Sequence, residues 1–343
     1  MTRALHGRGS IARVRTTVAV AFALSALGAA APAGAQEPGS PLPAGVAPAA
    51  APAAVEGRLV LRAERVGPER AVLAGTPWRV RGTLTPFVAG QEVTVRFVHG
   101  RTKVLVRRVT LRRRGRDGTF AVAFRTTRPG RVEVRASHRA TPQLATAVAR
   151  PVRVSVLPQR AAPGSNGLAV RVLQQRLAHL GYVVGRRGSF DGRTARAVVA
   201  FRKVTGMART QEADREVFRR LAGGQGAFRV RFPQHGRHVE ADISRQVVAL
   251  IGAGGRVERI YPTSSGAPTT PTILGSFSIY RKDPGTNALG MVHAAYFIRG
   301  YAIHGYASVP TYNASHGCLR VPVPDARSIF DWVRHGTRVD TYR

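Results

Sequence analysis

The pattern of apolar and polar positions changes its period twice along this chain, and the changes divide it into regions. Between residues 57 and 157, short runs such as Glu92–Phe97 and Arg131–Ala136 alternate apolar and polar side chains, and turn pairs such as Asp117-Gly118 separate them. Alternation with a period of two is typical of strands that bury one face. We therefore expect a small antiparallel β-sandwich of about seven strands over residues 57–157.

Between residues 160 and 222 the apolar residues recur at steps of three and four, which is the period of an α-helix. Val170, Leu173 and Leu177 mark a first helix that ends at Gly181. The apolar positions of two further helices are Ala197, Val198, Phe201 and Val204, then Val217, Phe218 and Leu221. The spacing predicts a three-helix module over residues 160–222.

Strand-like runs return between residues 235 and 343, for example Gln246–Ile251 and Val257–Tyr261. Residues 324–335 return to helical spacing and stop before Gly336. These patterns predict a β-rich domain with one peripheral helix. The expected fold class is therefore multidomain, with an all-β immunoglobulin-like sandwich, a small three-helix module and a β-rich C-terminal domain.

Residues 1–35 have the features of a secretory signal peptide. A start with four arginines is followed by an uncharged stretch over residues 16–31 and by the small residues Ala33-Gly34-Ala35. We expect cleavage before Gln36 and export to the cell envelope, either the periplasm or the cell wall; the alternative is a retained membrane anchor. Residues 36–56 are rich in Pro and Ala, which predicts a semi-extended linker.

The charge balance is strongly positive, with 53 Lys and Arg residues against 18 Asp and Glu residues and a net charge of +35. A surface this cationic adheres to polyanions. The predicted export favours anionic wall polymers or lipid headgroups as partners. Nucleic acid is not expected, because the chain lacks an aromatic platform on which bases could stack.

The chain has a single cysteine, Cys318, which lies in the run Ala314–Arg320. In an exported protein this thiol cannot pair within its own chain, so it is an accident, an intermolecular linker or a nucleophile, and the His and Gly residues around it favour the nucleophile. A thiol of ordinary pKa needs a neighbouring base at neutral pH, and histidine is suited to that task. His304 precedes Cys318 by fourteen residues, a contour of about 46 Å that allows the chain to fold back.

Three neighbours of this pair are candidates for the same chemistry. Gly317 permits a turn whose amides can face a developing oxyanion, and the Gly305 carbonyl can orient the His304 imidazole. Arg320 can bind a substrate carboxylate through its planar fork, or it can form an internal salt bridge.

Two other residues of the loop have more than one candidate role. His316 can transfer a proton or can only shape the turn. Ser315 can contact substrate, but a local hydrogen bond within the loop is the interpretation that we favour. His304, His316 and Cys318 could instead be three zinc ligands, although the motif lacks the acidic base of a hydrolytic zinc site.

The residues around this pair resemble the signature of the L,D-transpeptidase catalytic domain, also called the YkuD domain. The signature is Ile303-His304-Gly305 followed by Ser315–Arg320. Supporting matches, which together span nearly all of residues 235–343, are Ala241–Gln246, Ser265-Gly266, Thr270–Thr272 and Gly336–Val339. The chain departs from the family pattern at Thr270 to Gly275, where Ile273-Leu274 delays the expected glycine at the lip of the donor pocket.

The helical region resembles the peptidoglycan-binding module common in wall hydrolases. The matching residues are Gly167–Val170, Leu173-Gln174, Leu180–Tyr182, Phe190–Gly192, Thr194 and Ala197–Phe201. The second Asp-Gly loop that usually follows the second helix is absent, and Met207–Ala213 take its place. The alternative is a helical spacer that no longer binds sugar.

The resemblance implies an enzyme that cross-links peptidoglycan without a metal or organic cofactor. Cys318 would attack the carbonyl of the third residue of a tetrapeptide stem, D-alanine would leave, and an amine of a neighbouring stem would resolve the thioester. His304 would be the general base and acid, Gly305 would orient it, and amides around Gly317 and Cys318 would hold the oxyanion. Carbapenems would acylate the same cysteine.

Two other functions stay open at this point. In an L,D-carboxypeptidase, water would resolve the same thioester and trim the tetrapeptide stem. In a non-catalytic wall-binding protein, the basic modules would bind glycan and wall polymers beside a degenerate catalytic domain. The intact His304 and Cys318 count against this last interpretation.

Overall fold

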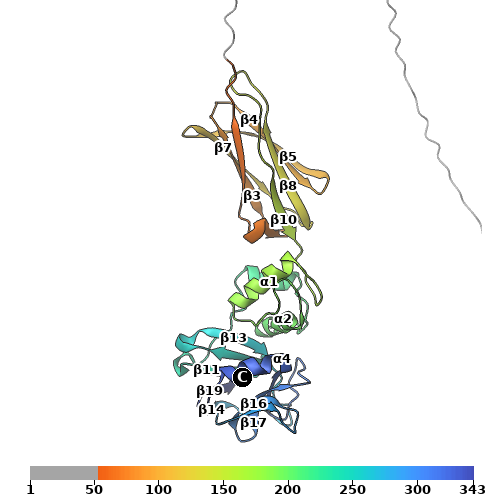
Figure 1. Ribbon diagram of the computed structural model, residues 1–343, viewed down its shortest axis with the longest axis vertical. Coiled ribbons are helices and arrows are strands. Elements are labelled where there is room, and N and C mark those ends of the chain that lie inside the picture. Colours follow the sequence, from red (N-terminus) through yellow and green to blue (C-terminus); the bar gives the residue numbers. More distant parts are fainter. Residues whose placement is uncertain (1–52) are drawn as a thin grey trace, which may run out of the picture. The chain divides into compact units, whose positions relative to one another are not determined.

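The computed structural model describes residues 53–343 (Figure 1). The predicted signal peptide and nearly all of the predicted linker lie outside the described residues. No helix within residues 53–343 is long and apolar enough to cross a membrane.

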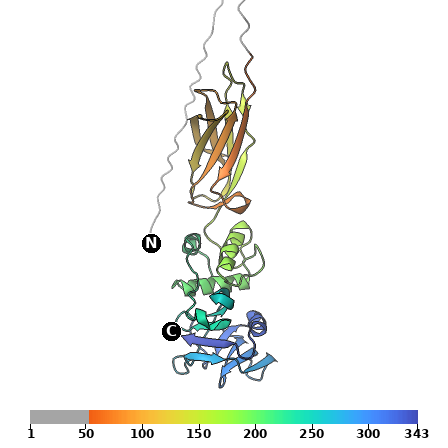
Figure 2. The same cartoon turned by 90° about the vertical axis from the view of Figure 1, so that its left-hand side faces the viewer.

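The N-terminal region, which we call the two-sheet domain, consists of two sheets around one apolar core (Figure 2). The first sheet has the order β1(Arg58–Glu64), β3(Trp78–Thr85), β7(Asp117–Phe124) and β6(Arg112–Arg114). The second has the order β2(Ala71–Leu73), β10(Val152–Leu157), β8(Gly130–His138), β4(Glu92–His99) and β5(Thr102–Thr110), with β9(Ala147–Val148) beside β8. Only β2 and β10 pair in parallel within these two sheets.

This region has ten strands, against about seven expected, and seven of them have six residues or more. Alternation explains why the sequence revealed most of the longer strands. In β3 every second side chain is buried, beginning with Trp78, whose ring packs against Phe97 and Phe124. Strand β5 was not predicted from the sequence, because most of its side chains are exposed and show no alternation. Strands β2, β6 and β9 are too short to show any period. The immunoglobulin-like assignment stays a prediction.

The helical module has the three predicted helices, α1(Leu168–His179), α2(Gly192–Val204) and α3(Arg215–Ala222). An aspartate caps the N-terminus of each of helices α2 and α3. Asp191 accepts a hydrogen bond from the Thr194 amide, and Asp214 accepts one from the Val217 amide. Helix α1 is followed by Gly181 at φ +92°, a backbone conformation that glycine adopts without strain.

The C-terminal domain contains two sheets and one helix. The larger sheet has the order β13(Val257–Pro262), β12(Val247–Ile251), β11(His238–Asp242), β19(Arg338–Tyr342) and β14(Gly275–Ser278). The smaller sheet has the order β15(Arg281–Thr286), β16(Val292–Ile298), β17(Tyr301–Tyr306) and β18(Leu319–Pro322), and it leads directly into α4(Val323–Trp332). Short 3-10 turns lie at Pro233–His235 and Ala253–Gly255, and another at Pro68–Arg70.

Helix α4 differs in two respects from the expected peripheral helix. It ends at Trp332, three residues before the predicted end, because Val333 is extended and buried and turns the chain toward β19. Its residues Ala326 and Ile329 belong to the same core cluster as side chains from both sheets. The helix therefore forms part of the core that positions the smaller sheet.

Strand β12 shows how the larger sheet is covered on both faces. Val248 and Leu250 pack into the core of the C-terminal domain, whereas Val247, Ala249 and Ile251 pack with the helices of the helical module. All five residues are buried. A strand with two buried faces needs an uninterrupted apolar run, which is what the sequence has here.

Candidate active site

Strands β17 and β18 bring the predicted base and nucleophile onto one face of the smaller sheet. They pair in parallel, with His304 opposite Arg320 and Ile303 opposite Leu319. Ile303 and Leu319 face the apolar core, whereas Cys318 packs with Ala302 on the other side. Because side chains alternate along a strand, His304, Cys318 and Arg320 share that second face.

His304 is buried, with 3% of its surface exposed, and its imidazole is held by a backbone carbonyl. Its Nδ1 lies 2.9 Å from the Gly305 carbonyl oxygen. A carbonyl can only accept a hydrogen bond, so Nδ1 carries the proton and Nε2 keeps its lone pair. Burial lowers the pKa of His304, the Gly305 carbonyl opposes that effect, and the charge of Arg320 lowers the pKa further. The imidazole is therefore neutral near pH 7 and can accept a proton.

Gly305 has a second function in this geometry. A Cβ atom at this position would lie 2.7 Å from the Cβ of Ala326 in α4. The glycine therefore allows the helix to pack directly on the strand that carries His304.

The Cys318 thiol is partly exposed and packs against a small apolar cluster that includes Tyr296 and Ala302. Its Sγ donates to the Gly300 carbonyl oxygen at 3.6 Å. Burial raises the pKa of the thiol, while the Ala302 amide and the Arg320 charge lower it by less. The resting thiol is therefore neutral, and it would have to lose its proton before it could act as a nucleophile.

Gly317 shapes the loop that presents the thiol. Its φ is +111°, and a Cβ atom there would lie 2.0 Å from the Cε1 atom of Tyr301. Its N–H donates to the Ser315 Oγ at 3.1 Å, and that hydroxyl in turn donates to the Cys318 carbonyl oxygen at 2.6 Å. The Gly317 amide is thus engaged within the loop. The oxyanion role of the amides around Gly317 and Cys318 stays a prediction.

The same bonds bear on Ser315. Its side chain is buried at 1% exposure and makes both of these hydrogen bonds within the loop. The geometry favours the loop-shaping role over the contact with substrate.

Thr272 is a site residue to which the sequence pattern assigned no role. Its hydroxyl donates to the Gly317 carbonyl oxygen at 2.8 Å and accepts from the Gly266 amide at 2.9 Å. Beside it, the Ser265 carbonyl accepts from the amides of Ala314 and Ser315. Residues 265–272 therefore brace the nucleophile loop, and the Ile273-Leu274 departure lies just beyond this brace. The Thr270–Thr272 match to the family was the available signal.

The positive charge of Arg320, which lies beside His304 and Cys318, is not neutralised by a carboxylate of the described residues. Its guanidinium lies 4.2 Å from the centre of the Tyr306 ring and donates to the Ala314 carbonyl oxygen at 3.3 Å. It forms no salt bridge with any carboxylate in residues 53–343. The internal salt bridge is thus not the role of this residue in the described structure, and its fork is available to a substrate carboxylate.

His316 is exposed on the same loop, and its role in proton transfer stays a prediction. Within the described part of the chain, no group of three or more His, Cys, Asp or Glu side chains could hold a metal ion. The zinc alternative therefore has no structural support.

Comparison with known proteins decides the family. The model of the L,D-transpeptidase catalytic domain, YkuD, matches residues 236–340, and a putative peptidoglycan binding domain matches residues 166–221. A crystal structure of the L,D-transpeptidase (residues 123-326) from Xylanimonas cellulosilytica DSM 15894 is 34% identical, and the match covers 54% of this chain and 98% of that chain with a TM-score of 0.50. The chain belongs to the L,D-transpeptidase family.

Two further solved structures resemble this L,D-transpeptidase. One is the L,D-transpeptidase (Yku) from Stackebrandtia nassauensis, with 18% identity, coverage of 53% of this chain and 95% of that chain, and a TM-score of 0.35. The other is an L,D-transpeptidase from Mycobacterium tuberculosis H37Rv, with 22% identity, coverage of 32% and 58%, and a TM-score of 0.29. The curated proteins contain no match. The protein is an acyltransferase-type enzyme of peptidoglycan cross-linking.

Proposed function

We propose that this L,D-transpeptidase links the third residues of two stem peptides through a thioester on Cys318. The observation that carries the proposal is the anchored imidazole: the Gly305 carbonyl holds Nδ1 of His304, on the face of β17 and β18 that also carries the single thiol. This arrangement leaves Nε2 as the basic atom.

In the first half-reaction, His304 Nε2 accepts the Cys318 proton as Sγ bonds to the carbonyl carbon of the third stem residue. The Cys318 amide stabilises the oxyanion. The tetrahedral intermediate collapses as the C–N bond to D-alanine breaks, and the imidazolium donates its proton to the departing amine. The uncompensated Arg320 binds a carboxylate of the donor stem.

In the second half-reaction, a side-chain amine of the acceptor stem attacks the thioester carbonyl. His304 accepts a proton from the amine, the C–S bond breaks, and the thiolate regains the proton from His304. The new amide bond joins the two third residues. An L,D-carboxypeptidase would use the same residues, with water in place of the amine.

The deciding experiment incubates the protein with purified disaccharide tetrapeptide and reads the products by mass, with Cys318→Ala as the matched control. We expect a dimer that has lost one D-alanine, and an adduct on Cys318 after brief exposure to a carbapenem. A tripeptide monomer without dimer would establish the carboxypeptidase instead. Product formation by Cys318→Ala would reject the thioester.

We also propose how the other regions serve this reaction. The signal-like residues 1–35 would export the chain to the cell envelope. The helical module would hold the enzyme on peptidoglycan, in keeping with its family match. The two-sheet domain would be an immunoglobulin-like spacer with a basic surface that contacts anionic wall polymers.

A further inference from the structure

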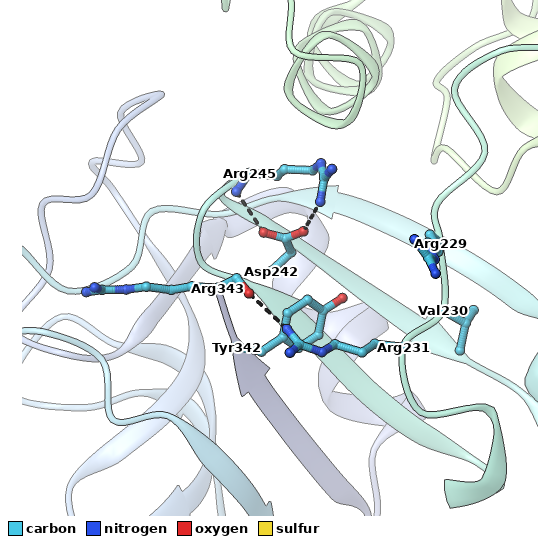
Figure 3. Close-up of a pocket in the computed structure, with 7 residues that line it drawn as sticks. All are labelled: Arg229, Val230, Arg231, Asp242, Arg245, Tyr342 and Arg343. Atoms are coloured by element: carbon cyan, nitrogen blue, oxygen red, sulfur yellow. Dashed lines mark hydrogen bonds and ion pairs between the residues drawn. The ribbon is translucent and has the colours of Figure 1, made fainter.

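A pocket of about 380 Å³ lies outside the active site, where the segment that follows the helical module meets β11 and β19 (Figure 3). We call it the arginine pocket. Its lining residues are Arg229, Val230, Arg231, Asp242, Arg245, Tyr342 and Arg343. None of them takes part in the proposed reaction.

Two guanidinium groups of this pocket are anchored and still keep free donors. Arg245 donates through Nη1 to Asp242 at 2.7 Å, and that carboxylate also accepts from the Arg245 amide. Arg231 donates through Nη1 to the Arg343 carbonyl oxygen at 2.8 Å and lies 4.7 Å from the centre of the Tyr342 ring. A guanidinium has five N–H groups, so each anchor leaves the other N–H groups available.

Arg229 supplies a third cation. It is exposed and makes no hydrogen bond or salt bridge with the residues that the structure describes. In Figure 3 the Arg343 side chain points away from those of Arg229, Arg231 and Arg245.

The pocket has more positive than negative charge. Asp242 is its one acidic side chain, against four arginines. Glu240 lies next to the Tyr342 hydroxyl, but it is buried and accepts hydrogen bonds from that hydroxyl and from the amides of Arg231 and Phe232.

We propose that the arginine pocket binds a phosphate or phosphodiester group. A tetrahedral anion offers oxygens in several directions and can accept hydrogen bonds from three separate guanidinium groups. The Tyr342 ring provides an apolar floor. The same chemistry occurs in free phosphate and in a phosphodiester polymer, and the experiment distinguishes the two.

The test is calorimetric titration of the full chain with inorganic phosphate, with an oligomer of glycerol phosphate and with polyglutamate. Arg229→Gln/Arg231→Gln should weaken binding of the phosphate-bearing probes at least about tenfold. The charge-matched control Arg334→Gln/Arg338→Gln, on exposed residues of the C-terminal domain that do not line the pocket, should change it less than about twofold. Tighter binding of the oligomer than of phosphate identifies the polymer as ligand, and equal site affinities identify the free anion.

Three outcomes would overturn the site. They are equal losses in both double variants, polyglutamate binding as tight as that of the phosphate oligomer, or no binding of any probe. If the double variant does not fold, Arg229→Gln alone decides, because that side chain has no bond to lose within residues 53–343.

A different observation carries a second inference, which concerns how the helical module contacts the C-terminal domain. Lys203 in α2 is buried at 3% exposure. Its Nζ donates to the carbonyl oxygens of Gln246 at 3.0 Å and Thr263 at 2.8 Å. Burial, together with a smaller contribution from the charge of Arg209, lowers the pKa of Lys203 to about 7. A buried amine is costly, so its placement at these carbonyls needs a compensating role.

The two residues whose carbonyl oxygens accept from Lys203 are themselves hydrogen-bonded to residues of the candidate active site. The Thr263 hydroxyl donates to the Arg320 carbonyl oxygen at 2.7 Å. The Gln246 side chain donates to the Ser265 hydroxyl at 2.6 Å and accepts from the Ser265 amide at 2.9 Å. Ser265 in turn holds the nucleophile loop through its carbonyl oxygen.

Arg209 makes a second connection, from the segment that replaces the usual Asp-Gly loop. Its Nη1 donates to the Thr311 carbonyl oxygen at 2.6 Å, and its Nη2 donates to that of Ser244 at 3.3 Å. Thr311 lies between the strand of His304 and Cys318. The departure at Met207–Ala213 thus supplies a contact with the loop that carries the nucleophile.

The geometry points to Lys203 and Arg209 as positioning residues through which the helical module completes the active site. This second inference rests on the proposed function. It assigns the module a role in the chemical step in addition to binding peptidoglycan.

The test compares Lys203→Met and Arg209→Gln with Arg215→Gln, an exposed arginine of the same module. We expect kcat to fall about tenfold in the first two with KM changed less than about twofold, and no change in the third. The pH profile of Cys318 alkylation by iodoacetamide should shift in the same two variants, and Arg209→Lys should recover part of the rate.

An unchanged kcat and alkylation profile would reject the positioning role. A rise in KM alone would reject it as well, in favour of substrate binding. Because alkylation does not depend on transpeptidation, the profile also decides the question if the proposed reaction itself is wrong.

Discussion

Two buried histidines of the C-terminal domain, His304 and His238, lie in opposite electrostatic surroundings. His304 contacts only a carbonyl oxygen through Nδ1, and its pKa is lowered, mainly by burial. For His238, burial also acts to lower the pKa, but the Glu240 carboxylate and the Gly236 carbonyl raise it above the ordinary value. The His238 Nε2 lies 3.1 Å from Glu240, whose own pKa is lowered.

The difference teaches what distinguishes a base from a structural cation. A histidine beside a carboxylate holds its proton and forms a buried ion pair. A histidine beside a carbonyl is oriented without being charged, and it keeps a lone pair for the thiol. The domain therefore holds His304 neutral, as the proposed base requires, and holds His238 in a buried ion pair.

The substitution His304→Gln is the strongest test of whether His304 is the base, and we expect kcat to fall about 10³-fold. The glutamine side chain can still donate to the Gly305 carbonyl but cannot accept the thiol proton. The measurement is product formation by mass, with thermal unfolding as a check of the fold. Activity within tenfold of the original protein would show that His304 is not the base.

His238→Gln should have the opposite result, a loss of about 2 kcal/mol in the free energy of unfolding with little change in kcat. The substitution leaves Glu240 buried with its neutral donors but without its cation. Urea denaturation gives the stability, and the transpeptidation assay gives the rate. A large drop in kcat at unchanged stability would mean that the two histidines have been assigned the wrong roles.

The pH dependence of stability should also separate the two. A raised pKa means that His238 contributes stability below pH 6.5, which is lost as the pH rises through its folded value. A lowered pKa means that the unfolded chain binds more protons at His304, so its contribution improves as the pH rises toward 6.5. Each slope is at most about 1.4 kcal/mol per pH unit.

The measurement is the difference in unfolding free energy between the original protein and each Gln variant, taken from pH 5 to 8. The two differences should change in opposite directions. Parallel changes would contradict the assigned pKa directions.

The smallest expected effect tests the neutral hydrogen bonds that hold the active site. Thr272→Val removes the hydroxyl that bonds the Gly317 carbonyl, and we expect a cost of about 1 kcal/mol and a fall in kcat of about fivefold. Thr341→Val is the control, because its hydroxyl bonds the Ile273 carbonyl, outside the loop. Equal falls in kcat in both variants would show that the brace at Thr272 is not specific to the nucleophile.

The pattern of apolar and polar residues was sufficient to predict strands that bury one face, such as β3, and the three helices of the helical module. It was insufficient for β5, because the exposed Val104 and Val106 flank the half-buried Leu105 and hide the period of two. It also misplaced the end of α4, because the extended backbone of Val333 follows from tertiary burial and not from helical spacing.

By itself, the sequence determined the family and the residues on which the proposed chemistry rests: one thiol, a histidine fourteen residues before it and glycines beside both. Only the tertiary structure decided which groups are free to act. Ser315 occupies the Gly317 amide, Thr272 holds a carbonyl 45 residues away, and Lys203 reaches Thr263 across 60 residues. Such bonds depend on how strands and helices pack, because hydrogen bonding is short-ranged in space but unrestricted along the chain.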